Sequence, residues 1–121
     1  MTAYHEPIEG IPPKDRDISR ALNSLKEEIE AVDWYHQRVV STEDETIKTV
    51  LAHNRDEEIE HACMMIEWLR RNMPQWDEEL RTYLFTDKPI TEVEEEEEGS
   101  KSVSSGDLEI GSLKNTNKEG D

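Results

Sequence analysis

The chain of 121 residues has room for one modest domain with tails. Its 30 Asp and Glu outnumber its 14 Lys and Arg, and the formal net charge of −16 argues against a nucleic-acid partner, whose phosphates require basic patches. An acidic surface attracts cations, although it also simply keeps helical proteins soluble.

The cysteine content and the hydropathy of the chain bear on its compartment. Cys63 has no partner for an internal disulfide, which indicates a reducing, cytoplasmic environment. No apolar run approaches the roughly 18 residues of a membrane span. The first residues also lack the basic start and apolar run of a signal peptide. We therefore expect a cytoplasmic protein without a membrane partner.

Residues 1–13 contain three prolines and a glycine, a composition that predicts an irregular arm. A first helix then begins near Lys14 to Asp17, where acidic residues suit the positive end of the helix dipole. Its inward positions alternate steps of four and three, which is a helix-packing stripe. They are Ile18, Leu22, Leu25, Ile29, Val32, His36 and Val39.

A second helix is predicted from about residue 43 to residue 72, with Pro74 ending it. Thr42 with Glu45 three residues later forms a capping box, the mark of a new helix N-terminus. Its stripe again follows steps of four and three: Ile47, Leu51, Asn54, Glu58, His61, Met65 and Trp68. Two long helices joined by a tight turn predict an antiparallel hairpin.

Beyond the hairpin, Pro74 opens a shorter third helix, and a loop follows at residues 86–89. The glutamate run 94–98 is either a helical extension or a solvated stretch of charge. From residue 99 to residue 121 the chain is rich in Ser, Gly and Lys, a composition that stays disordered. We therefore predict an all-α protein with one helical domain over residues 14–98.

Two neighbouring positions of the second stripe carry chemistry instead of apolar side chains. Glu58 and His61, at i and i+3, share one helix face, so both can reach one ion. This Glu-x-x-His spacing recurs in helical bundles that hold a pair of irons. Glu28 is inward on the first helix and as far from the turn as Glu58, roughly 22 Å at about 1.5 Å per residue. The two glutamates are therefore expected to face each other.

One chain supplies only half of a di-iron site. Such a site needs about four carboxylates and two histidines from four helices, whereas this chain offers two carboxylates and one histidine from two helices. A two-fold dimer doubles this set. We therefore predict a metal site on or beside a dimer axis, although a lone Glu-x-x-His usually marks only a solvated face.

A rival cluster combines Asp33 and His36 with His53 at the matching level of the second helix. We rank it below the first, as a satisfied polar layer or a secondary ion site. Tyr35, one heptad after Glu28, could hydrogen-bond to a metal-bound carboxylate, whereas Trp34 is more easily read as packing.

The stretches EEIEAVDWYHQR, LAHNRDEEIEHACMMIEWLRR and RTYLFTDKPI closely resemble the encapsulated ferritins, which are ferritin-like cargo proteins of encapsulin compartments. The resemblance runs from about Leu25 to Ile90. It implies that the hairpin is half of a ferritin-like bundle completed by dimerisation, and that the dimers form a ring. It also implies a ferroxidase, which oxidises Fe(II) to Fe(III) with dioxygen at a site holding two irons per dimer.

The resemblance carries over to individual residues. It assigns the iron ligands to Glu28, Glu58 and His61, the residues that the register had selected. It matches the aromatic neighbours of the site to Trp34 and Tyr35. The acidic residues of a metal-entrance site match Glu27 and Glu30, which lie on another face of the first helix and are otherwise read as solvated.

The tail contains three apolar residues in a polar stretch, Leu108, Ile110 and Leu113, within the segment 107–114, DLEIGSLK. Such residues gain nothing by folding locally but can dock in a partner's groove. The segment resembles the peptide that attaches cargo to the inner wall of an encapsulin shell. The protein is therefore expected inside an encapsulin nanocompartment, whose shell receives the oxidised iron.

Two other functions remain open at this point. The protein may keep the metal but change the task, as a passive iron or manganese binder or a peroxide-consuming di-iron protein. Alternatively, it is a helical scaffold delivered to the shell for interaction alone, without metal.

Overall fold

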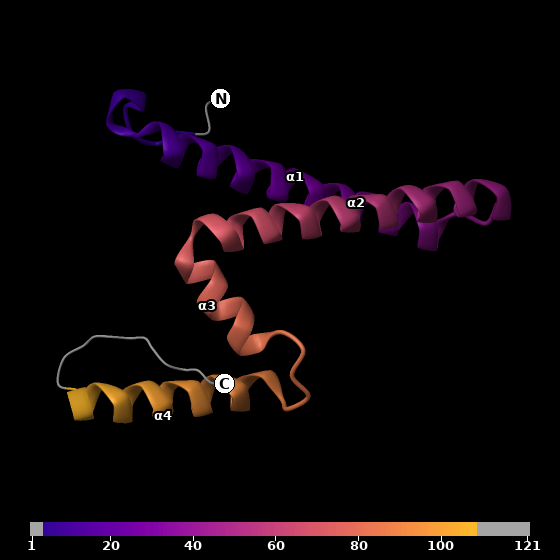
Figure 1. Cartoon of the computed structure of the whole chain (residues 1–121). Helices are drawn as coiled ribbons and strands as arrows, with labels where there is room; N and C mark the ends of the chain where they lie inside the picture. The colour runs from indigo at the N-terminus through magenta and orange to yellow at the C-terminus, as the bar shows by residue number, and fades with distance from the viewer. Residues whose placement is uncertain (1–3, 109–121) are drawn as a thin grey trace. The chain divides into compact units, whose positions relative to one another are not determined.

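The computed structural model describes residues 4–108, with side chains through Gly99. The regular structure of this range is helical: a short 3-10 helix at Ile8–Gly10, then α1 (Pro13–Ser41), α2 (Glu45–Asn72), α3 (Pro74–Tyr83) and α4 (Ile90–Leu108) (Figure 1). This confirms the all-α class. The chain forms two compact units, which meet in sequence between Asp77 and Glu78 and are described separately. None of the helices within residues 4–108 has the length and apolarity to cross a membrane.

Helices α1 and α2 lie side by side and run antiparallel, as the sequence predicted (Figure 1). Pro13 opens α1, since its missing N–H is not needed in the first turn. The predicted capping box at Thr42 is wrong in its register. Asp44 caps α2 instead, and its carboxylate accepts hydrogen bonds from the N–H groups of Thr46 and Ile47 at 2.8 and 3.4 Å. Thr42 accepts from the N–H of Asp44 and so shapes the turn.

The core between α1 and α2 is small. Ala21 and Leu25 from α1 pack with Ala62 and Leu69 from α2, and Leu69 is fully buried. Partly buried apolar side chains surround this cluster: Ile18, Met65, Ile66, Met73 and Trp76.

Several residues of the predicted stripes remain exposed. Leu22, Ile29 and Trp68 keep 39%, 55% and 36% of their surface accessible. A strict heptad stripe drifts by about 20° per heptad along a straight helix, so its outer members leave the contact line. A layer of two helices also has one contact face, and apolar side chains beside that face stay uncovered.

An ion-pair network fixes the bend between α2 and α3. Pro74 ends the hydrogen-bonding of α2, and Arg70 then reaches from α2 to Asp77 of α3. Arg70 also binds Glu67, which Arg71 contacts at 2.7 Å. These bonds lower the pKa of Glu67 from 4.5 to about 2, with the hydrogen bond from Arg70 as the largest cause.

The second unit contains the end of α3, the loop and α4. The third helix and the loop are confirmed, and the glutamate run is helical within α4. Lys88, in the loop, donates to both carboxylate oxygens of Glu96 at 2.8 and 2.7 Å, and Val93 is buried. The sequence placed the end of the helical domain at residue 98, and the backbone of α4 continues to Leu108.

Candidate metal centre

Three side chains that the sequence singled out come together halfway along the hairpin. Glu28 belongs to α1, and Glu58 and His61 belong to α2. His61 Nδ1 lies 3.5 Å from Glu28 Oε1 and 3.5 Å from Glu58 Oε1. One donor atom from each residue falls within 4.8 Å of the others, and no second group of three such residues occurs in the described part of the chain. We call these three residues the half-site.

Electrostatics in the half-site favours a cation. The side chains of Glu28 and Glu58 keep only 25% and 26% of their surface, whereas His61 keeps 45%. A hydrogen bond with Glu58 raises the pKa of Glu28, and desolvation and the charge of Glu58 raise it further, while His61 opposes the shift. The two carboxyl groups therefore hold a proton between them more tightly than a solvated pair does. A bound cation would take the place of that proton.

The half-site opens onto an exposed apolar side of α2. Val50, Met64 and Trp68 share the side of α2 on which His61 lies, because their spacings of 11, 3 and 4 residues return to one helix face. Their exposed fractions are 52%, 58% and 36%. Contiguous apolar side chains of this kind mark an interaction surface. A partner that covered this side would also enclose His61.

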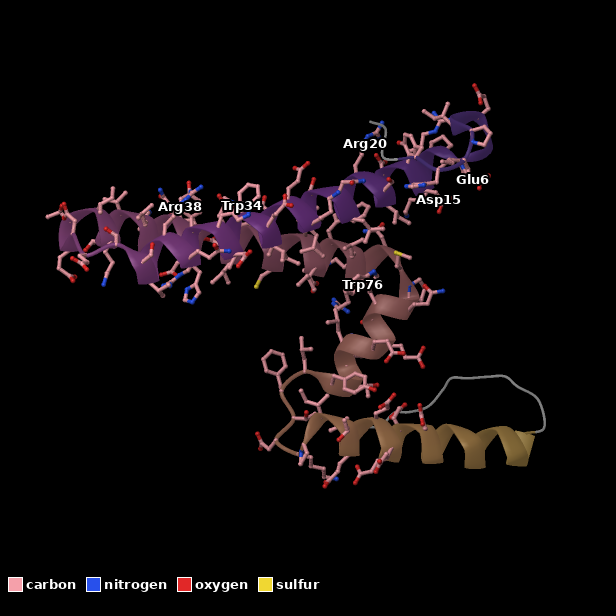
Figure 2. All side chains as sticks on the ribbon, turned by 180° about the vertical axis from the view of Figure 1, so that it is seen from behind. Glu6, Asp15, Arg20, Trp34, Arg38 and Trp76 are labelled. Carbon is pink, nitrogen blue, oxygen red and sulfur yellow. The ribbon has the colours of Figure 1, made fainter. Side chains whose placement is uncertain are left out.

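The predicted neighbours of the site do not contact it within one chain. Trp34 is 52% exposed and projects from α1 away from α2 (Figure 2). Tyr35 is half-buried, and the guanidinium of Arg38 lies 5.2 Å from the centre of its ring. Glu27 and Glu30 are exposed on α1. Any role of these residues at the metal therefore depends on a second chain.

The rival cluster is divided among other contacts. His36 Nδ1 lies 3.1 Å from Nη1 of Arg55, and because a guanidinium only donates, the ring nitrogen accepts this hydrogen bond. His53 pairs instead with Glu57 at 3.2 Å, and Asp33 accepts a hydrogen bond from Gln37. This arrangement favours the interpretation of a satisfied polar layer.

Arg55 was missed in the sequence, although its position three residues before Glu58 places it on the inner side of α2. Ile110 and Leu113 of the tail segment lie outside the described residues, and Leu108 is the last residue of α4.

Comparisons with known proteins agree with this architecture. The EncFtn-like family model matches residues 3–87. A "Ferritin-like protein" from Thermotoga maritima is 69% identical over 91% of this chain and 96% of its own length. An "Encapsulated ferritin-like protein" from Rhodospirillum rubrum is 48% identical over 91% of this chain and 86% of its own.

Among solved structures, a crystal structure of a protein from Nitrosomonas europaea superposes with a TM-score of 0.71 at 54% identity. It covers 74% of this chain and 98% of its own chain. With the family model spanning most of the chain and relatives this similar over nearly their full length, the protein belongs to the EncFtn-like family, the encapsulated ferritins that its sequence resembles.

Proposed function

We propose that this protein is a ferroxidase that oxidises Fe(II) to Fe(III) with dioxygen at a di-iron site shared between two copies of the chain. The observation that carries the proposal is the half-site, in which Glu28, Glu58 and His61 bring their donor atoms within 4.8 Å of one another. Membership of an encapsulated ferritin family supports an iron-related function.

The donor set fits iron. Carboxylate oxygens are hard anionic ligands and favour Fe(III) over Fe(II), while an imidazole suits iron of either charge. When two irons are bound, they supply the electrons that reduce dioxygen. The protein's own task is to hold the two ions side by side and to keep the ligands deprotonated. His61 binds as neutral imidazole, so its protonation at acidic pH opposes metal binding.

A dimer completes the ligand count. One chain contributes two carboxylates and one imidazole, and a second copy related by a two-fold axis brings the total to four and two. The exposed His61, on a side of α2 that also exposes Val50, Met64 and Trp68, is placed for such a partner. Each dimer would then bind two irons.

We propose further that the protein is cargo of an encapsulin shell. The Rhodospirillum rubrum relative is named as encapsulated. A Myxococcus xanthus protein, 29% identical over 73 residues, is named as an encapsulin nanocompartment cargo protein. The tail residues Leu108, Ile110 and Leu113 would attach this chain to the inner shell wall, and the shell would store the oxidised iron.

The first test is aerobic oxidation of Fe(II) by the purified protein, followed by absorbance and oxygen consumption. Wild type should oxidise iron rapidly and bind about two irons per dimer. His61→Ala and Glu58→Ala should both lose this activity, whereas His53→Ala, which removes an exposed histidine of the same helix, should retain it. Full oxidation rates in either half-site variant would refute the assignment.

The same measurement separates the other candidate functions. A passive metal binder would bind iron without consuming oxygen. A peroxide-consuming protein would oxidise iron faster with peroxide than with dioxygen. A scaffold would bind no iron, and its dimer would be indifferent to the metal.

A further inference from the structure

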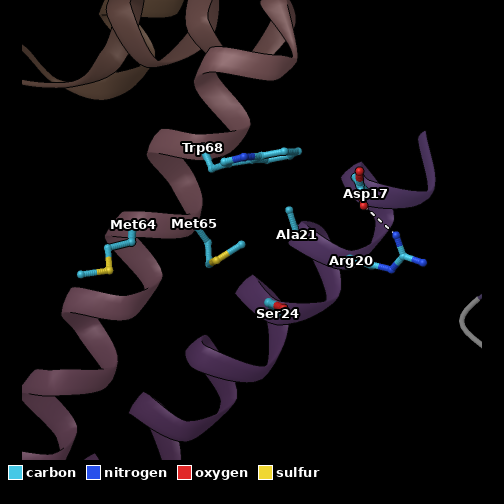
Figure 3. Close-up of a pocket in the computed structure, with 7 residues that line it drawn as sticks. All are labelled: Asp17, Arg20, Ala21, Ser24, Met64, Met65 and Trp68. Atoms are coloured by element: carbon cyan, nitrogen blue, oxygen red, sulfur yellow. Dashed lines mark hydrogen bonds and ion pairs between the residues drawn. The ribbon is translucent and has the colours of Figure 1, made fainter. Parts of the chain in front are cut away.

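A groove lies one to two helical turns from the half-site, between the first half of α1 and the second half of α2. Its walls are Ala21 and Ser24 on α1 and Met64, Met65 and Trp68 on α2, and its volume is about 400 Å³ (Figure 3). Ser24 is one turn before Glu28, and Met65 is one turn after His61. The groove therefore continues the side on which the half-site opens.

The rim of this groove is charged. Asp17 and Arg20 line it and form an ion pair of 2.6 Å (Figure 3). Both side chains are well exposed, at 57% and 68%. The groove thus offers an apolar floor, with a carboxylate and a guanidinium at its outer end.

The complementary features lie on the other side of the half-site, on the same helix. Trp34 and Tyr35 follow Glu28 by six and seven residues, about 9 to 10 Å at 1.5 Å per residue, and Arg38 follows by ten. The groove is centred near Ala21, seven residues before Glu28, and Asp17 precedes Glu28 by eleven. Arg20, Trp34 and Arg38 project from one edge of α1 (Figure 2).

We propose that the groove is the seat of the Trp34–Tyr35 pair of a second copy of this chain, held there by an ion pair between Arg38 and Asp17 across the interface. The proposal rests on the dimer of the proposed function. A two-fold axis that crosses the helices at the half-site reverses the second copy. It therefore maps the residues after Glu28 onto the level of those before it. Trp34 and Tyr35 then reach the level of Ala21, and Arg38 reaches that of Asp17.

A two-fold axis along the helices gives a poorer interface. It would place each groove opposite the other groove, and each Asp17 and Arg38 opposite its own copy. Like charges facing each other across an interface are unfavourable, and an unfilled groove loses its packing contacts. The crossing axis instead fills an apolar groove with aromatic side chains, the residues most effective at interface centres.

Charge reversal tests the ion pair. Asp17→Arg and Arg38→Asp should each raise the dimer dissociation constant about tenfold or more, because like charges would then meet at two symmetric places. The double variant should recover most of the loss. Lys26→Glu, an exposed charge reversal outside this side of α1, is the control, and sedimentation velocity is the measurement. Single variants that dimerise like the control, or a double variant with no recovery, would overturn the proposal.

A cross-link tests the orientation of the axis. With Cys63→Ser as background, Asp17→Cys combined with Arg38→Cys should give a disulfide-linked dimer on mild oxidation, and neither single variant should. A dimer linked through Asp17→Cys alone would mean that the axis runs along the helices, and would contradict the proposal.

The outcome is separable from that of the proposed function. If wild type oxidises iron but the charge pair has no effect, only the docking proposal fails. If the double variant recovers dimerisation while wild type does not oxidise iron, only the proposed function fails.

Discussion

Glu28 and Glu58 hold like charges close together, and this should cost the metal-free protein stability. Glu58 raises the pKa of Glu28, so the folded chain binds a proton that the unfolded chain has already released above pH 4.5. The free energy of unfolding therefore falls as the pH rises from 4.5 through the raised pKa, and the penalty persists above it. A metal ligand set commonly costs stability in this way.

We expect Glu28→Gln to raise the melting temperature of the metal-free protein at neutral pH, because it removes one of the two facing charges. The same variant should lose iron binding in a separate titration. Glu27→Gln, an exposed neighbour, should leave the melting temperature unchanged. A Glu28→Gln protein less stable than wild type would show that the carboxylate is structural.

Glu67 shifts in the opposite direction and predicts a different pH dependence. Its pKa is lowered to about 2 by Arg70 and Arg71, so its charge stabilises the fold fully above pH 4.5. That contribution is lost as the pH falls from 4.5 to about 2, where the folded protein takes up the proton. Glu67→Gln should therefore unfold more easily at pH 6 and show a flatter loss of stability on acidification.

Urea unfolding at a series of pH values measures this effect. Glu60→Gln, at an exposed position of the same helix with no such partners in the structure, provides the control. Parallel pH profiles for wild type and Glu67→Gln would contradict the assignment of the α2–α3 bend to this network.

At the scale of the helices, the hairpin depends on very few buried side chains. Leu69 is the most buried apolar residue and contacts the cluster of Ala21, Leu25 and Ala62. Leu69→Ala should lower the free energy of unfolding by about 2 to 5 kcal/mol, since the space left behind cannot collapse completely. Val40→Ala, at 66% exposure on α1, should change it by less than about 0.5 kcal/mol. Equal effects of the two substitutions in urea unfolding would show that the core lies elsewhere.

The helices and their pairing could be predicted because apolar spacing and proline positions are local signals. Pro74 ended α2 and opened α3 as expected, and the equal distances of Glu28 and Glu58 from the turn predicted that they meet. The cap was misassigned because Thr42 and Asp44 both accept backbone hydrogen bonds, and only geometry decides which one begins the helix.

The exposed members of the stripes could not be identified from spacing alone. The pattern at Leu22 and Ile29 is the same whether a side chain packs inside one chain or beside another. Likewise, His36 had ligand spacing in the sequence, and its contact with Arg55 depends on the rotation of α2 against α1. Such information lies in tertiary geometry and not in sequence periodicity.

At the scale of the whole molecule, the proposed catalytic and docking functions occupy different parts of the chain. The half-site lies between residues 28 and 61, and the segment proposed to bind the shell lies at residues 107–114. Nothing in the half-site geometry involves the tail. The two functions should therefore be separable by truncation.

Removal of residues 107–121 should leave iron oxidation per chain unchanged and abolish loading into an encapsulin shell when the two proteins are produced together. Each buried Leu or Ile contributes about 1.5 to 3 kcal/mol, so three anchors give a binding energy that suits reversible docking. A dimer carries two tails, and simultaneous docking of both strengthens attachment without any new contact. Replacing Leu108 alone by Ala should therefore reduce loading partially, whereas replacing all three apolar residues should abolish it. Gel filtration of purified shells with quantification of cargo measures the effect. Full loading of the triple variant would place the shell-binding residues elsewhere in the chain.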